Sequence, residues 1–154
     1  MGIDGLQDRH KPGRDIIHRW KENPLIEIDD LDFMCSDIHN AGVVFYGGEY
    51  LLLITIEHLS GKRCIHLATP HNFHFTVDPT PFLEPSQDPK YKQHESHGVL
   101  DARVTFLEGY YYITYIAFGD HGYRLGLAKT KDFESVERVG LIAVLRIVID
   151  PIDR

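Results

Sequence analysis

The chain has 154 residues, 43% of them hydrophobic, which is enough to form the core of one domain. Its formal net charge of -7 argues against nucleic acid as a partner, because phosphate binding needs clustered lysine and arginine. The apolar runs are too short to span a bilayer, and no basic segment followed by an apolar stretch indicates a signal peptide. Cys35 and Cys64 are expected to be buried thiols, so we expect a cytoplasmic protein that binds neither nucleic acid nor membrane.

A strand-rich module follows a polar lead-in segment, residues 1–24. The module, residues 40–78, is predicted to contain four strands, at residues 43–46, 50–56, 64–69 and 74–77. Gly47-Gly48 separates the first two strands, and such a pair indicates a hairpin because glycine accepts positive φ. A connector, residues 79–97, comes next and is rich in proline, which excludes a central strand.

A second module, residues 101–140, repeats the first at an offset of about 61 residues. Asn40-Ala41-Gly42-Val43 falls on Asp101-Ala102-Arg103-Val104, and the later turn glycines also coincide. The second set of strands is expected at residues 103–107, 111–117, 124–128 and 136–139. Repeated four-stranded units predict an all-β propeller, in which roughly 4–8 blades close a ring. The modules are therefore interpreted as two blades, within residues 25–140.

Two blades cannot close a ring, so each is expected to expose an apolar face. Either several copies assemble through these faces as a homo-oligomer, or the chain is a piece of a longer one. The tail, residues 141–154, favours the second explanation, because it is aliphatic and starts no third repeat. We interpret it as the product of a truncated or frameshifted reading frame from about residue 143.

Several segments resemble glycoside hydrolase family 130, the β-mannoside phosphorylases and mannosidases, over roughly residues 18–143. The matching segments are Asn23-Pro24-Leu25, Asn40-Ala41-Gly42-Val43, Gly98-Val99-Leu100-Asp101-Ala102-Arg103 and Leu127-Ala128-Lys129-Thr130-Lys131-Asp132-Phe133. The resemblance implies a five-bladed propeller that cleaves β-mannosidic bonds with inversion at the mouth of its central channel. The expected substrate is a β-mannoside or mannooligosaccharide. Inorganic phosphate is the expected co-substrate in most members and water in others, with no further cofactor.

Asp101 and Asn40 are the site residues that the resemblance implies most directly. Asp101 falls on the family's acid, which protonates the glycosidic oxygen through a hydroxyl of the bound mannose, and Asn40 falls on a sugar ligand. Both stand at the start of the first strand of their module, so a propeller would direct them to one channel. The structural alternatives are that Asp101 caps a turn or pairs with Arg103, and that Asn40 is a turn residue.

Three further candidates for substrate binding lie in the second module: Arg103, Asp120 and His121. Arg103 could position Asp101 or bind an anion, with a blade-internal ion pair as the alternative. Asp120 and His121 either line the channel or form a solvated turn. Many family members carry, at the place of Thr55, an arginine that helps to hold an anion or acceptor sugar, so this chain departs from the pattern there.

The sequence therefore predicts a family 130 fragment with Asp101 as the proton donor, weakly active or inactive alone. The alternative is a non-catalytic carbohydrate-binding or assembly module that oligomerises to close a propeller. The ten histidines predict no metal site, because the pairs with three-residue spacing, His94 with His97 and His71 with His74, lie in loop or strand context.

Overall fold

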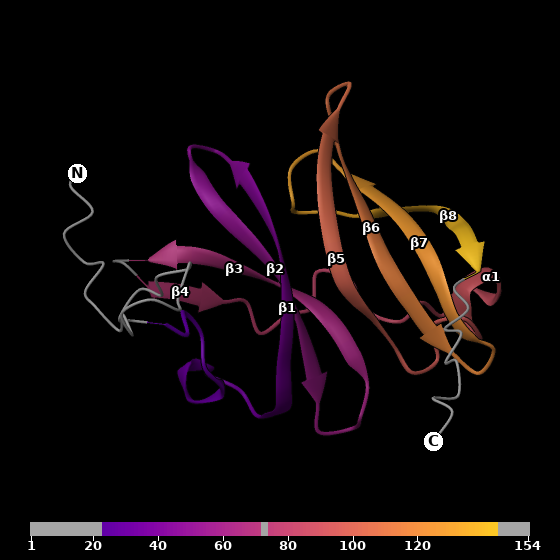
Figure 1. The fold of residues 1–154 in the computed structure, drawn as a ribbon, viewed down its shortest axis with the longest axis horizontal. Coiled ribbons are helices and arrows are strands. Elements are labelled where there is room, and N and C mark those ends of the chain that lie inside the picture. The colour runs from indigo at the N-terminus through magenta and orange to yellow at the C-terminus, as the bar shows by residue number, and fades with distance from the viewer. Residues whose placement is uncertain (1–22, 72–73, 145–154) are drawn as a thin grey trace, which may run out of the picture.

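Residues 23–71 and 74–144 are described by the computed structural model (Figure 1). They form eight strands that lie in the sheet order β1-β2-β3-β5-β6-β7-β8, with β4 paired to β3. The strands are β1 (Cys35–Tyr46), β2 (Glu49–His58), β3 (Arg63–His71), β4 (His74–Val77), β5 (Gly98–Leu107), β6 (Tyr110–Gly119), β7 (Gly122–Thr130) and β8 (Glu137–Val144). The predicted all-β fold of two four-stranded units is confirmed. We call β1–β4 blade one and β5–β8 blade two.

All strands except β4 are longer than the sequence predicts, and β1 and β5 differ most. β5 begins at Gly98 instead of Arg103, so that Asp101 lies inside it. β1 begins at Cys35 instead of Val43, and its polar first half pairs with the end of β2. β8 continues through Val144, which pairs with Arg124 on β7. The first residues of the aliphatic tail thus complete the edge of blade two, and the tail beyond Val144 lies outside the described residues.

The hairpins of the two blades use the turns that the sequence indicates. Gly47 and Gly48 have φ of 62° and 91°, and in blade two Glu108 and Gly109 have φ of 50° and 80°. Positive φ at both central residues gives the turn a twist that matches the twist of the flanking strands. The two copies therefore share one hairpin geometry, although only the first has glycine at both positions.

The innermost strands of the two blades, β1 and β5, contact each other directly. Figure 1 shows the two blades as separate fans with β1 and β5 at their facing edges. A Cβ atom on Gly42 would lie only 2.6 Å from the carbonyl oxygen of Ala102, so this contact requires glycine. The sheet itself continues between the blades through one parallel pair, Arg63 on β3 with Gly98 on β5.

The main hydrophobic core lies between the blades and includes the connector. It joins Leu53 and Ile65 of blade one to Ile113 and Tyr115 of blade two, with Leu83 of the connector against them. Exclusion of these large side chains from water is the main stabilising contribution to the pairing of the blades. No helix in the described part of the chain is long and apolar enough to cross a bilayer.

A second core cluster covers the other face of blade one. Ile54 and Ile56 of β2 pack there against Leu31 and Phe33, which precede β1 and follow the 3₁₀ turn η1 (Ile28–Asp30). Cys35 also lies against this cluster, and Cys64 is buried; both thiols are free. The segment before β1 therefore packs over one face of blade one, and we call it the cover segment.

The connector holds a buried carboxylate that the sequence did not reveal. It contains one helical turn, α1 (Pro89–Lys92), followed by Glu95, which has 0% exposure. Glu95 accepts hydrogen bonds from the Tyr115 hydroxyl at 2.8 Å, from Arg138 at 2.8 and 3.1 Å, and from the Ser86 N–H at 2.9 Å. Burial raises the pKa of the Tyr115 hydroxyl, and the Glu95 charge adds to the rise. This cluster, formed by Glu95, Tyr115 and Arg138, links the connector to β6 and β8 through hydrogen bonds.

Candidate functional site

Asn40 and Asp101 occupy equivalent irregularities in the two innermost strands. The register of β1 against β2 shifts between His39 and Ala41, and that of β5 against β6 shifts between Leu100 and Arg103. Within these bulges the φ angles of Asn40 and Asp101 are 23° and 58°. Residues with a side chain rarely adopt positive φ, and bulges of this kind re-aim a side chain out of the regular alternation. Each blade therefore presents one polar residue from the same place.

A hydrogen bond joins these two irregularities across the blade boundary. Thr55 on β2 is the cross-strand partner of His39, the residue before Asn40. Its Oγ1 accepts a hydrogen bond from the backbone N–H of Asp101 at 2.9 Å. Asn40 and Asp101 consequently occupy equivalent bulges inside β1 and β5, and not the starts of these strands as the sequence predicted, because both strands begin earlier.

The carboxylate of Asp101 is partly open and lies beside one cation. Its side chain is 34% exposed, and a terminal nitrogen of Arg103 lies 2.7 Å from Oδ1. The approach lacks the direction of a hydrogen bond, and Oδ1 accepts none from the described residues. The other terminal nitrogen of Arg103 donates to the carbonyl oxygen of Ala102 at 2.9 Å. Arg103 is thus placed to hold Asp101 through Oδ1, which is itself buried, while the side chain as a whole stays partly exposed.

A row of charged side chains continues from Asn40 into blade one. The Nε2 atom of His39 lies 3.6 Å from Asp37 Oδ2 and 4.0 Å from Glu57 Oε2. Glu57 pairs with Arg63 at 2.5 Å, and the Arg63 guanidinium lies over the Phe118 ring of blade two. The row was not predicted from the sequence, because the sequence predicts that β1 begins only at Val43. His39 and Asp37 lie in the additional first half of β1, and Glu57 and Arg63 pair at the facing ends of β2 and β3.

Asp120 and His121 are placed against the connector. Asp120 Oδ1 accepts a hydrogen bond from Ser96 Oγ at 2.9 Å and lies 3.2 Å from His97 Nε2. His121 Nε2 lies 3.1 Å from the side-chain oxygen of Gln93. Within the described ranges, neither residue has a polar contact with Asp101 or Asn40. These contacts favour the alternative of a turn that is anchored to the connector.

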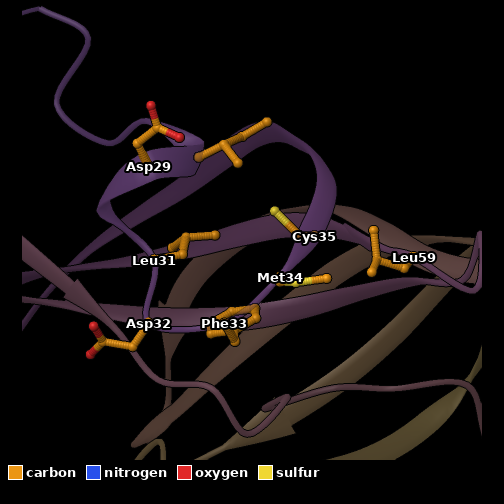
Figure 2. A pocket seen from close by; sticks show the side chains of 8 residues that line it. Asp29, Leu31, Asp32, Phe33, Met34, Cys35 and Leu59 are labelled. Atoms are coloured by element: carbon orange, nitrogen blue, oxygen red, sulfur yellow. The ribbon is translucent and has the colours of Figure 1, made fainter.

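Two surface grooves lie away from Asp101. Figure 2 shows one of about 500 Å³, formed where the segment before β1 meets the turn after β2. Its lining is largely apolar, with Met34 and Leu59 its most exposed members, and it includes the carboxylates Asp29 and Asp32. Another groove of about 420 Å³ includes Tyr110, at the far end of blade two. Neither of these two grooves is lined by Asn40 or Asp101, so neither is part of the candidate site.

A histidine pair in blade one is coupled to the cover segment. The Nδ1 atom of His66 lies 2.8 Å from the carbonyl oxygen of Asp78, and its Nε2 lies 3.0 Å from Nε2 of His58. The ring of Phe33 stacks on both imidazoles. Across the residues that the structure describes, no three His, Cys, Asp or Glu side chains form a group suited to a metal ion. The pair is therefore interpreted as part of the packing of blade one.

The stability of the protein should fall as the pH drops below about 6.5, the ordinary pKa of histidine. Burial lowers the pKa of His66; its bond to Asp78 opposes this, and His58 adds to the lowering. The unfolded chain then binds a proton that the folded chain resists, so the free energy of unfolding decreases on acidification. Urea unfolding at pH 7.5 and 5.5 measures this. His66→Asn should reduce the difference in unfolding free energy between the two pH values. His74→Asn, which replaces an exposed histidine, should leave that difference as it is in the parent. Equal differences for the parent and both variants would contradict the assignment to His66.

The two four-stranded blades, which meet at their innermost strands β1 and β5, are the repeated units of a β-propeller. The chain belongs to glycoside hydrolase family 130. The family model described as beta-1,4-mannooligosaccharide phosphorylase matches residues 8–152. The resemblance seen in the sequence is thereby confirmed, and with it the propeller architecture.

Individual relatives support the same assignment. The beta-1,2-mannobiose phosphorylase of Listeria innocua serovar 6a is 38% identical over 185 residues, covering 82% of this chain and 51% of the relative. The structure of the Listeria innocua enzyme with beta-1,2-mannobiose has a TM-score of 0.66 at 25% identity, with the same coverage. The structure of a putative glycoside hydrolase from Parabacteroides distasonis has a TM-score of 0.66 at 26% identity. The match covers 77% of this chain and 40% of the hydrolase chain. The chain spans about half the length of the curated relative it matches.

Proposed function

We propose that this protein acts on β-mannosides by inverting cleavage, with Asp101 as the proton donor. The observation that carries the proposal is the placement of Asp101 in a positive-φ bulge within β5, the innermost strand of blade two. There its carboxylate is partly exposed beside Arg103. Bulges of this kind are frequent next to active sites, and a general acid must reach the substrate oxygen that it protonates. Membership of family 130 supplies the reaction class.

The other candidate residues, apart from Asp101, are assigned as follows. The amide of Asn40 binds a hydroxyl of the mannose, because it stands in blade one where Asp101 stands in blade two. Arg103 holds the Asp101 carboxylate in place. Asp120 and His121, which the sequence suggested as further ligands, are tied to the connector and are left with a structural role.

In the proposed reaction the bond between the anomeric carbon and the glycosidic oxygen breaks. An oxygen of inorganic phosphate or of water forms the new bond to the anomeric carbon from the opposite face, and Asp101 delivers the proton to the departing sugar, through a hydroxyl of the mannose. A phosphate nucleophile can replace the second carboxylate of an inverting glycosidase. The products are then α-mannose 1-phosphate and the released sugar. When water attacks, a second carboxylate must accept a proton from the water, and the products are α-mannose and the released sugar.

Two types of substrate linkage are supported by the names of the family model and of one relative. The family model is described by β-1,4-mannooligosaccharides and the relative from Listeria innocua by β-1,2-mannobiose. We therefore propose β-1,2- or β-1,4-linked mannosides as the substrate class. Because the chain spans about half of that relative, we expect slow turnover by these 154 residues alone.

Incubation with β-1,2- and β-1,4-mannobiose, each with and without phosphate, tests the proposal. The expected result is slow release of mannose from one disaccharide, with α-mannose 1-phosphate as the second product in the phosphate arm, both followed by NMR. Saturation-transfer NMR on the same samples reports binding separately from turnover. Failure of both disaccharides to bind or to be cleaved would contradict the proposal.

A non-catalytic assembly module is the second candidate, and exposed aromatic side chains favour it. Phe45, Tyr50 and Phe106 are 59%, 60% and 61% exposed near the hairpin tips of the two blades. Apolar surface of this kind is typical of protein contacts when it is contiguous. Light scattering separates the candidates: a stable closed oligomer that binds a mannoside without cleaving it would favour the module.

A further inference from the structure

The backbone at Asp101 has a conformation that its own strand does not maintain. The ladder between β5 and β6 is interrupted from Leu100 to Arg103, so β6 does not pair with Asp101. Its φ of 58° lies in the left-handed region, where a residue with a side chain stays only if its surroundings hold it. The group that holds this residue must therefore come from another element.

Thr55 of blade one is that group. Its side-chain oxygen accepts the N–H of Asp101 at 2.9 Å, and the residue has 0% exposure, so water cannot replace the bond. A threonine side chain is short and prefers few rotamers, which fixes the acceptor in space. The contact of Gly42 with Ala102 holds β1 against β5 beside this bond.

We propose that Thr55 is a positioning residue for Asp101, and that its hydroxyl couples the bulge at Asp101 to the bulge at Asn40. Thr55 pairs with His39 on the Asn40 side and bonds Asp101 on the other. A displacement of β2 is thus transmitted to both candidate site residues together. The catalytic consequence rests on the proposed function, whereas the positioning itself does not.

The position is notable because the family resemblance implies an arginine there in many members, and this chain has a hydroxyl. A long cation reaches outward to a ligand, whereas a buried threonine reaches only its immediate neighbours. In this chain the residue therefore acts on the backbone of the proton donor. Thr55 is absent from the site residues that the sequence analysis named.

The test compares Thr55→Val, which keeps the shape and removes the acceptor, with Thr55→Ser, which keeps the acceptor. Thr130→Val is the matched control, because Thr130 is also buried and its Oγ1 accepts the N–H of Phe133, whose φ is 57°. Hydrogen exchange of the Asp101 amide is measured by NMR. We expect Thr55→Val to accelerate it about tenfold, the size of one lost hydrogen bond, and Thr55→Ser to stay within about twofold of the parent.

The control variant should leave the Asp101 amide unchanged and accelerate exchange at Phe133. An Asp101 amide that exchanges equally in the parent and in Thr55→Val would overturn the proposal. If Thr55→Val does not fold, amide exchange in the parent protein tests whether the Asp101 N–H is held. The Asp101 amide should exchange at least about tenfold more slowly than that of Glu108, a positive-φ residue in an exposed turn, and equal rates would overturn it.

A second readout links positioning to turnover. For a mannoside that is cleaved, Thr55→Val should lower kcat about tenfold with KM unchanged, because a misdirected proton donor weakens the transition state and leaves ground-state binding intact. Thr55→Ser should restore kcat. Normal kcat together with faster exchange at Asp101 would refute the catalytic consequence. If no mannoside is cleaved at all, the proposed function fails and the exchange data still decide the positioning.

Discussion

Replacing Asp101 with asparagine is expected to reduce the cleavage of mannobiose by about 10²–10⁴-fold, the usual contribution of a general acid. The Asp101→Asn change keeps the size of the side chain and the backbone N–H that bonds Thr55, and removes the transferable proton. Binding of the disaccharide should change little, because the sugar is held by other groups as well. Turnover is followed by NMR detection of released mannose, with binding measured by saturation transfer.

The leaving group makes this prediction specific for proton donation. An aryl β-mannoside such as 4-nitrophenyl β-mannoside expels a phenolate that needs no protonation, so D101N should affect its cleavage far less than that of mannobiose. Asp120→Asn is the control, since Asp120 is an exposed carboxylate in the same blade, tied to the connector. Equal losses on both substrates in D101N would assign Asp101 a structural role.

Replacing Glu95 with glutamine is expected to destabilise the protein by about 3–5 kcal/mol, as measured for buried ion pairs that lose one partner. The change leaves Arg138 charged in a site where its side chain is 18% exposed, and replaces one of the two acceptor oxygens of Glu95 with an NH2 group that can only donate. The free energy of unfolding in urea measures the loss. Glu137→Gln is the matched control, because Glu137 is an exposed carboxylate paired with Lys129, and surface pairs contribute about 0–1 kcal/mol.

The double variant Glu95→Leu with Arg138→Met separates the cost of an unpaired charge from the value of the pair. It should recover most of the stability lost in Glu95→Gln, since removing both charges together leaves neither one unpaired. A loss of less than about 1 kcal/mol in Glu95→Gln would contradict the assignment of this cluster as the fastening of the connector.

The sequence repeat made the two blades predictable, and it also predicted that Asn40 and Asp101 hold equivalent positions in them. A fixed offset aligned the two residues, and the turn glycines marked the hairpins, because these features depend on local sequence alone. The early start of β1 was not predictable in the same way. Ser36, Asp37 and His39 show no apolar alternation, and their strand conformation comes from pairing with β2.

The roles of Thr55 and Glu95 could not be predicted from the sequence for a related reason. Nothing in the sequence near Thr55 or Glu95 tells which partner, 46 or 20 residues away, each will meet. Glu95 read as one charge in a charged connector, and its burial follows from the packing of that connector against β6. Positive φ at Asn40 and Asp101 was equally invisible, because neither residue is glycine and the bulge arises only when two strands are in register.

The bond between Thr55 and Asp101 belongs to neither blade alone, and this bears on how such a protein could arise. A single four-stranded unit holds either the acceptor or the acidic residue of this bond, so the direction of Asp101 depends on a second copy beside it. The two copies differ at this point, because the second carries Ile116 where the first carries Thr55. The boundary between two units, and not the repeated unit itself, therefore carries the specialised contact.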